Sequence, residues 1–223
     1  MAVKLIVFEG TDGSGKATQT ALLCGELDRR GIPYRRLEFP RYSEDSSALI
    51  RLYLGGAFGS DPGDVNAYAA STFYAVDRYA SYQRVWKDYY QGGGFVVSDR
   101  YTTSNAVHQG SKVPEGERAE FFRWLYDLEY DRMGLPRPNL VVLLDMPVEL
   151  SEQLMRKREQ STGTHADIHE RDEDYLKKCR DVALHAAKYY GWRTVSCAKD
   201  GAIRGVEDIH EEVYAIVKSC LED

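Results

Sequence analysis

The chain has 223 residues, 43% of them hydrophobic and 29% charged, and carries a formal net charge of −6. This length accommodates one α/β domain with a full core and is short for two domains. The acidic balance argues against a nucleic-acid-binding surface that covers the whole molecule, and no apolar run approaches the roughly 18 residues of a membrane-spanning helix. The N-terminal run LIVF is also too short for a signal peptide. We therefore expect a cytoplasmic protein that binds neither nucleic acid nor membranes.

Short apolar runs alternate with helical patterns along the whole chain. Strands are predicted at residues 4–10, 34–39, 95–98, 139–145 and 192–196. A helix follows the first strand and ends at Gly31, and a long helix is predicted over 64–94, with Asp64 as its N-cap and three glycines as its stop. Strand then helix, repeated about five times, indicates a mostly parallel sheet with helices on both faces. We expect residues 1–223 to form a single domain, with ligands bound beyond the carboxyl ends of the strands.

The spacing of the cysteines indicates the redox state of the compartment in which the protein works. They are scattered without a C-x-x-C pair, which favours free thiols in a reducing compartment over disulfides or a zinc site. The four residues are Cys24, Cys179, Cys197 and Cys220.

The segment FEGTDGSGKATQ, residues 8–19, lies between the first strand and its helix. Gly10, Gly15 and Lys16 have the Gly-x4-Gly-Lys spacing of a phosphate-binding loop. Such a turn points successive backbone N–H groups into one concavity, and the helix N-terminus adds partial positive charge. The lysine can then reach the β- and γ-phosphates of a nucleotide. The predicted ATP-binding residues of the loop are Gly10, Asp12, Gly13, Ser14, Gly15, Lys16, Ala17 and Thr18.

Ala17 stands where such loops usually carry Ser or Thr, whose hydroxyl binds Mg²⁺. Thr18 is no simple replacement, because one helical step turns it about 100° away. Mg²⁺ usually relies on substrate phosphates and one or two carboxylates, so Asp12 and Asp99 are the candidate metal ligands. A nucleotide-binding regulator that has lost catalysis is therefore an alternative to an enzyme.

Polar side chains gather in the segment SDRYTTSNAVHQG, residues 98–110, where the third strand ends. Those expected in the crevice are Asp99, Arg100, Ser104, Asn105 and Gln109. Earlier in the chain, Tyr74 and Arg78 lie four residues apart and share one helix face. The ring could stack on a base while the guanidinium reads a carbonyl or a phosphate. A tyrosine packed in the core beside a solvated arginine is the alternative interpretation.

Taken together, these motifs resemble the thymidylate kinase family. The phosphate loop and four further segments occur in that family's order and at its spacings, nearly end to end. The further segments are FPRY (39–42), FYAVDR (73–78), DRYTTSNAVHQG (99–110) and LPRPNLVVLLDMP (135–147). The resemblance implies a P-loop NTPase fold, a three-layer sandwich around about five parallel strands, with a lid. It also implies transfer of the γ-phosphoryl group of ATP to dTMP with Mg²⁺, and a homodimer.

The resemblance assigns roles to individual residues as well. Tyr74 matches the aromatic residue that stacks on thymine, Arg78 the arginine that reads a base carbonyl, and Arg100 the arginine that grips the acceptor phosphate. Asp12 matches the loop carboxylate that approaches the acceptor and organises Mg²⁺. The implied catalytic set is Lys16, Arg100, Arg158 and Asp12. The implied acceptor-binding set is Phe39 and Pro40, typically joined by a cis bond, with Tyr42, Tyr74, Arg78, Arg100, Asn105, His108 and Gln109.

At two positions the chain departs from the family pattern, and these departures leave the identity of the acceptor nucleotide open. His108 stands where some bacterial members carry tyrosine near the sugar edge, and Tyr74 stands where many carry phenylalanine. Either change could direct the enzyme to another nucleoside monophosphate. A polar residue tolerated at the pocket rim is the alternative interpretation of His108.

The charge-rich segment after the fourth strand resembles the family's lid, which we expect at about 156–170. Because the phosphate loop contains no arginine, the resemblance assigns transition-state contact to Arg158 and adenine stacking to Arg156. Asp167 and Glu170 match lid carboxylates that touch the acceptor or the metal. A solvated charged face is the alternative interpretation of this segment.

The same segment contains two histidines at helical spacing. They are four residues apart and lack a third ligand at a sensible distance, so we expect them to face solvent rather than to bind a metal. These residues are His165 and His169.

Overall fold

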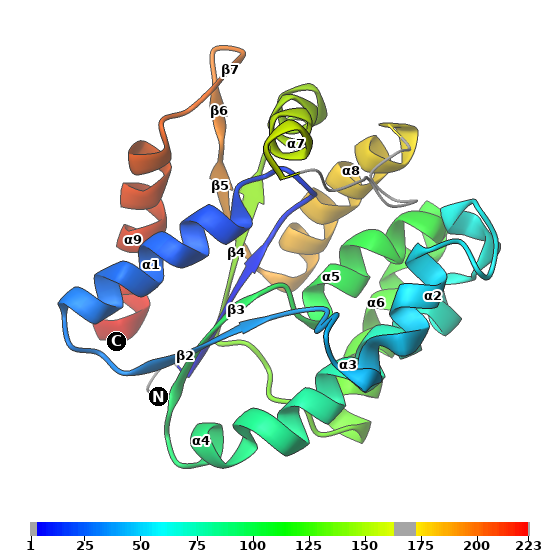
Figure 1. The fold of residues 1–223 in the computed structure, drawn as a ribbon, viewed down its shortest axis with the longest axis horizontal. Coiled ribbons are helices and arrows are strands. Elements are labelled where there is room, and N and C mark those ends of the chain that lie inside the picture. Colours follow the sequence, from blue (N-terminus) through cyan, green and yellow to red (C-terminus); the bar gives the residue numbers. More distant parts are fainter. Residues whose placement is uncertain (1–3, 163–172, 223) are drawn as a thin grey trace.

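A five-stranded sheet forms the centre of the molecule (Figure 1). The computed structural model describes residues 4–162 and 173–222, and the side chains within 4–156 and 174–221. The strands are β1 (Leu5–Glu9), β2 (Tyr34–Glu38), β3 (Phe95–Asp99), β4 (Leu140–Asp145) and β5 (Arg193–Ser196). Their order across the sheet is β2-β3-β1-β4-β5, and every pairing is parallel. The parallel sheet predicted from the strand–helix alternation is confirmed.

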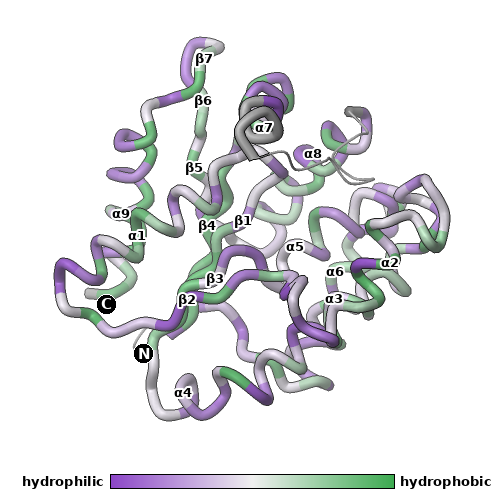
Figure 2. Tube along the Cα trace, viewed as in Figure 1, coloured by the Kyte–Doolittle hydropathy of each residue, from purple (hydrophilic) through white to green (hydrophobic). Residues whose placement is uncertain are grey.

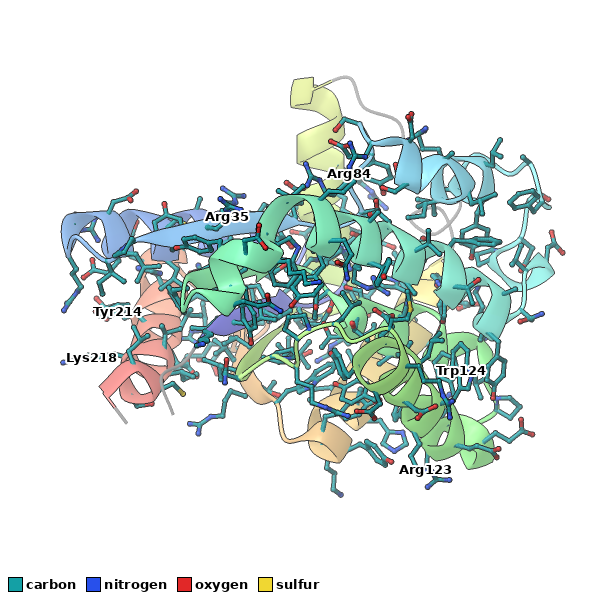
Figure 3. All side chains as sticks on the ribbon, turned by 90° about the horizontal axis from the view of Figure 1, so that it is seen from below. Arg35, Arg84, Arg123, Trp124, Tyr214 and Lys218 are labelled. Atoms are coloured by element: carbon teal, nitrogen blue, oxygen red, sulfur yellow. The ribbon has the colours of Figure 1, made fainter. Side chains whose placement is uncertain are left out.

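Helices cover both faces of this sheet (Figure 1). One face carries α1 (Lys16–Arg29) and α9 (Val206–Glu222), and the other carries α3 (Ala67–Ser81), α5 (Thr102–His108), α6 (Arg118–Tyr126) and α8 (Glu173–Tyr190). The remaining α-helices of the described residues are α2 (Ala48–Leu54), α4 (Lys87–Gln91) and α7 (Val148–Thr162). A two-stranded hairpin of β6 (Ala198–Lys199) and β7 (Ala202–Ile203), which the sequence did not predict, joins β5 to α9. Figure 3 shows Tyr214 and Lys218 of α9 at the opposite end of the molecule from Arg123 and Trp124 of α6.

Alternating residues of each strand build two separate hydrophobic cores. Leu5 and Val7 of β1 pack with the helices α5, α6 and α8, whereas Ile6 and Phe8 pack with α1 and α9. A strand that is buried on both faces reads as a continuous apolar run, which is why LIVF is visible in the sequence as a strand. Figure 2 shows this apolar centre within more polar outer segments.

The carboxyl edge of the sheet is acidic. Four neighbouring strands end in a carboxylate residue: Glu38 of β2, Asp99 of β3, Glu9 of β1 and Asp145 of β4. Glu9 and Asp99 are nearly or fully buried, so their charges need partners. The cations that supply them come from the loops and helices that follow the strands, which concentrates charged groups at this edge.

The predicted long helix over 64–94 is corrected in two ways. It begins at Ala67, capped by Asn66, whose side chain accepts from the Ala69 N–H at 2.9 Å. Asp64 instead closes a capping box with Asp61 in a separate 3₁₀ turn. The helix then passes through a π-helical segment, Tyr82–Trp86, before α4. The sequence pattern misplaces the start of the helix, because the cap depends on which of two nearby side chains, Asp64 or Asn66, reaches the backbone of the first turn.

The described cysteines are free thiols, as predicted, and three of the four are buried. Among the described residues, no helix is long and apolar enough to cross a membrane.

Candidate active site

The segment between β1 and α1 is a tight backbone turn. Gly10, Gly13 and Gly15 have φ angles of 153°, 75° and 89°, which a side chain would strain. A Cβ at Gly13 would lie 2.5 Å from the carbonyl oxygen of Ser151, and one at Gly10 would lie 2.8 Å from that of Leu144. Gly15 is the N-cap of α1 and provides no side-chain cap. The first N–H groups of α1 therefore form an anion-binding cradle made of backbone.

Lys16 lies inside this turn. Its side chain is 7% exposed, and Nζ donates at 2.8 Å to the carbonyl oxygens of Gly10 and Thr11. Burial lowers the pKa of Lys16, and the positive charge of Arg100 lowers it further, against the raising effect of nearby carboxylates. The amine is thus held at the mouth of the cradle by backbone carbonyls rather than by a carboxylate that would neutralise it.

A cavity of about 520 Å³ opens above the turn. It is lined by Asp12, Gly13, Gly15, Lys16, Ala17, Thr18, Glu38, Phe39, Pro40, Tyr42, Asp99, Arg100, Leu154 and Met155. Six of the eight predicted ATP-binding loop residues are therefore on its wall, and the other two, Gly10 and Ser14, lie beneath it. Ser14 is buried, and its Oγ has no hydrogen-bond partner within the described part of the chain.

The acidic residues of this cavity fit a magnesium ion that is held mainly by a nucleotide. Within the described ranges, no group of three or more His, Cys, Asp or Glu side chains could hold a metal ion without a substrate. Asp12 and Asp99 nevertheless line the same cavity as the phosphate loop. Mg²⁺ typically takes one or two protein carboxylates, substrate phosphates and water, and these two residues would supply the carboxylates.

Arg100 occupies the boundary between the phosphate loop and the rest of the crevice. Its φ of 64° is left-handed, a conformation that residues other than glycine rarely adopt. Its NH2 group donates to Asp12 at 2.6 Å, and NH1 lies 3.6 Å from Glu9. Burial lowers the pKa of Arg100, but the charges of Asp12 and Glu9 outweigh that and raise it above the usual value. Arg100 therefore carries a permanent charge in a low-dielectric site.

Glu9 is a site residue that the sequence interpretation missed. Its carboxylate is fully buried and accepts from the Gly10 N–H at 2.9 Å and from the hydroxyls of Thr103 and Ser104 at 2.7 Å. It thus connects the phosphate loop to α5, which follows Arg100. The available signal was a charged residue at the end of an apolar strand, next to the first loop glycine.

A second, smaller pocket adjoins the phosphate-loop cavity. It is lined by Asp12, Phe39, Pro40, Tyr42, Leu54, Tyr74, Arg78, Arg100, Tyr101, Ser104, Asn105, His108 and Gln109. Every residue of the predicted acceptor-binding set is on this wall, and the Phe39–Pro40 bond is cis as expected. The two cavities share Asp12, Phe39, Pro40, Tyr42 and Arg100. A ligand in one cavity would therefore face a ligand in the other across Asp12 and Arg100.

Arg78 is buried and ion-paired rather than solvated. It is 2% exposed, and its Nε and NH2 groups donate to the two oxygens of Glu129 at 2.6 and 2.5 Å. Burial lowers the pKa of Arg78, and the charge of Glu129 more than offsets this, so the pKa is raised. The interpretation of Arg78 as a solvated surface residue is wrong, and its partner 51 residues away has no local sequence signal.

His108 forms part of the pocket wall and faces Arg100. The Arg100 NH1 group lies 3.0 Å from Nε2 of His108. A guanidinium only donates hydrogen bonds, so this nitrogen accepts and the ring is neutral, with its proton on Nδ1. Nδ1 in turn lies 3.7 Å from Sγ of Cys179. The imidazole is 7% exposed, which makes it a wall residue rather than a tolerated rim residue.

Comparison with known proteins assigns this constellation to a family. A family model described as thymidylate kinase matches residues 8–213. The chain belongs to the thymidylate kinase family. It is 32% identical over 200 residues to a thymidylate kinase of Mycobacterium tuberculosis, a match that covers 88% of this chain and 92% of the relative. It is 31% identical over 215 residues to a probable thymidylate kinase of Thermococcus onnurineus, with 96% of each chain covered.

A solved structure supports the same fold. The thymidylate kinase of Candida albicans superposes with a TM-score of 0.72, at 20% identity, over 98% of this chain and 92% of that one. The fold predicted from the sequence, a P-loop kinase sheet of parallel strands between two helical layers, is thus confirmed.

The predicted thymidylate kinase lid is described only in part. Leu154 and Met155 of α7 line the phosphate-loop cavity. The neighbouring Arg156 is exposed, pairs with Glu152 at 3.4 Å and is not among the lining residues, so its assignment to adenine stays a prediction. The side chains of Arg158, His165, Asp167, His169 and Glu170 lie outside the described residues.

Proposed function

We propose that this member of the thymidylate kinase family transfers the γ-phosphoryl group of ATP to dTMP, giving ADP and dTDP, with Mg²⁺. The observation that carries the proposal is the shared wall between the two cavities. A backbone phosphate cradle with a buried lysine opens on one side of Asp12 and Arg100, and an aromatic, polar pocket opens on the other. Two nucleotides bound there would meet at their phosphates.

The chemistry asked of the protein is mainly positioning and charge stabilisation. Lys16 would contact the β- and γ-phosphates from inside the cradle, and Arg100 would bind the acceptor phosphate as it attacks. Both cations are largely buried, where a fixed charge is more effective than in water. Mg²⁺, held by Asp12 or Asp99 and the phosphates, would neutralise developing charge on the transferring group. We assign the lid, at about 156–170, the task of excluding water and supplying Arg158.

Two features favour alternative acceptors or functions. His108 and Tyr74 line the acceptor pocket, at positions where some bacterial members of the family carry tyrosine and many members carry phenylalanine, so another deoxynucleoside monophosphate is the second candidate. Ala17 removes one metal contact and favours a nucleotide-binding regulator. The position of Arg100 between the two cavities argues against the regulator, since a protein that only binds a nucleotide needs no cation there.

We also propose a cytoplasmic homodimer built from single-domain chains. Apolar side chains that are about half exposed lie on α2 and α3, namely Leu49, Leu52 and Val76. Burying such a surface against a second copy would remove apolar area from water.

The decisive experiment is ADP production from Mg-ATP with a panel of acceptors: dTMP, dUMP, dCMP, UMP, CMP, AMP, dGMP and none. Turnover dominated by dTMP is the expected result. A preference for another monophosphate would contradict the acceptor assignment but keep the kinase. ATP binding without turnover on any acceptor would contradict the kinase and favour the regulator.

A further inference from the structure

Glu129 is a fully buried carboxylate beneath the acceptor pocket. It lies within a π-helical segment, Asp127–Arg132, that continues α6. Its main partner, Arg78, lies just before the other π-helical segment of the described chain, Tyr82–Trp86. Short π-helical segments are rare and are frequently found at functional sites. The ion pair is thus set between two helices that both depart from α-helical geometry next to it.

Each oxygen of Glu129 accepts two hydrogen bonds. Oε2 accepts from Nε of Arg78 at 2.6 Å and from the Thr102 hydroxyl at 2.8 Å. Oε1 accepts from NH2 of Arg78 at 2.5 Å and from Nδ2 of Asn105 at 3.3 Å. Arg78 and Asn105 both line the acceptor pocket, whereas Glu129 does not. The Glu129 carboxylate therefore accepts hydrogen bonds from two residues of the pocket wall, Arg78 and Asn105, without lining the pocket itself.

This contact, together with one to the Ser71 carbonyl oxygen, decides which atom Asn105 presents to the pocket. Nδ2 of Asn105 donates to Glu129 and also to the Ser71 carbonyl oxygen at 3.1 Å, which uses both of its hydrogens. Turning the amide over would place Oδ1 against these two oxygens, with no hydrogen between them. The acceptor oxygen of Asn105 is therefore the atom left for a ligand.

Arg78 provides the complementary group. Its guanidinium has five N–H groups, and the described contacts to Glu129 and to the Tyr101 carbonyl oxygen use three of them. The remaining N–H groups are donors on a residue that lines the pocket. The wall thus combines N–H donors from Arg78 with an oxygen acceptor from Asn105.

We propose that Glu129 is a positioning residue that sets the hydrogen-bond polarity of the acceptor pocket and thereby its choice of base. A donor beside an acceptor complements a base edge that carries a carbonyl next to a ring N–H, as in thymine and uracil. Cytosine presents an amino group next to a bare ring nitrogen, so both contacts would be mismatched. The inference rests on the proposed function, in which the acceptor base occupies this pocket.

The test is a Glu129→Gln variant, measured with dTMP and dCMP as acceptors. Glutamine replaces one of the two accepting oxygens with a donating NH₂ group, so it can no longer accept all the hydrogen bonds from Arg78 and Asn105, and it weakens the hold on both side chains. We expect the ratio of kcat/KM for dTMP to that for dCMP to fall about tenfold or more, while the KM for ATP changes less than about threefold. The ratio of the two dissociation constants, from calorimetry, should fall in parallel.

Two further variants separate selectivity from stability. Thr102→Val removes one hydrogen bond to Glu129 and leaves the two from Arg78 and the one from Asn105, so it should keep the wild-type ratio. Glu129→Asp retains the charge and shortens the reach, so it provides a folded variant if the glutamine variant does not fold, and its ratio should also fall. Thermal unfolding of all variants shows which are folded.

The possible outcomes are distinct. Equal losses on dTMP and dCMP in a folded Glu129 variant, with the ratio unchanged, would overturn the positioning role. Loss of selectivity in Thr102→Val to the same extent would also overturn it, since the contact to Asn105 would not be the cause. A wild-type protein that phosphorylates neither pyrimidine would instead contradict the proposed function, and the inference with it.

Discussion

The phosphate loop and the acceptor pocket are adjacent but built over very different distances in the sequence. The loop is contiguous, and its binding groups are backbone N–H groups positioned by glycines at 10, 13 and 15. The pocket takes its wall from the phosphate loop, the loop after β2, α2, α3, the residues that follow β3, and α5. Its two central polar residues, Arg78 and Asn105, are further held by Glu129, which comes from yet another segment, Asp127–Arg132.

This difference has a physical consequence. A backbone cradle tolerates changes of side chain that preserve its φ angles. Alanine can therefore stand at position 17 in place of the usual serine or threonine without changing the backbone of the loop. A pocket of side chains depends on every partner being present, because a buried charge left without its partner is costly. Substitutions in the phosphate loop should therefore change nucleotide binding or turnover with little effect on stability. Substitutions in the acceptor pocket should change both the binding of the acceptor and the stability of the protein.

The largest expected effect is that of Lys16→Ala. The variant removes the only described lysine of the cradle, and turnover should fall by about 10³-fold or more, as for loss of a central electrostatic contact. Because Nζ bonds only to loop carbonyls in the described chain, the fold should be retained. A coupled ADP assay and thermal unfolding measure the two quantities. Retained turnover would show that the lysine is not part of the transfer step.

The next largest effect is expected for Arg78→Ala. Removing the guanidinium leaves the Glu129 carboxylate buried without its main partner, so the variant should lose about 3 kcal/mol of stability. The affinity for dTMP should fall about 100-fold, and that for ATP much less. Urea unfolding and calorimetric titration of both nucleotides test this. Equal losses of affinity for both would place Arg78 outside the acceptor side.

A smaller, pH-dependent effect is expected at Lys112, which donates to the Tyr53 hydroxyl and the Val65 carbonyl oxygen near α2 and α3. Burial lowers its pKa to about 8 from 10.5. Between these values the unfolded chain binds more protons, so stability should rise with pH from about 8 to 10.5. Relative to Lys112→Met, the wild type should gain up to about 3 kcal/mol over this range. The measurement is urea unfolding of both proteins at several pH values. Parallel pH profiles would contradict the lowered pKa.

The smallest effect is expected for Ala17→Thr, which restores a hydroxyl to the loop. Because Mg²⁺ already has phosphates and carboxylates as ligands, the concentration of Mg²⁺ that gives half-maximal turnover should fall only a few-fold. Ala17→Val has nearly the same shape without the oxygen and is the matched control. If valine and threonine behave alike, the effect comes from packing and the donor side does not use this position for the metal.

The sequence by itself determined the features that depend on neighbouring residues. The apolar run of β1, the glycine spacing of the loop and the position of Lys16 follow from local backbone preferences, and the order of strands and helices follows from periodicity. The set of residues on the pocket wall came from the family resemblance, because no spacing rule brings residues 39, 74 and 105 together.

Only the tertiary structure decided how these residues are paired. It showed that Arg78 is a buried ion-pair partner of Glu129, that Glu9 connects the loop to α5, and that His108 accepts from Arg100. It also placed the cap of α3 at Asn66 rather than Asp64. Burial makes the pairing of polar groups obligatory, but packing between distant segments determines which partner each one finds.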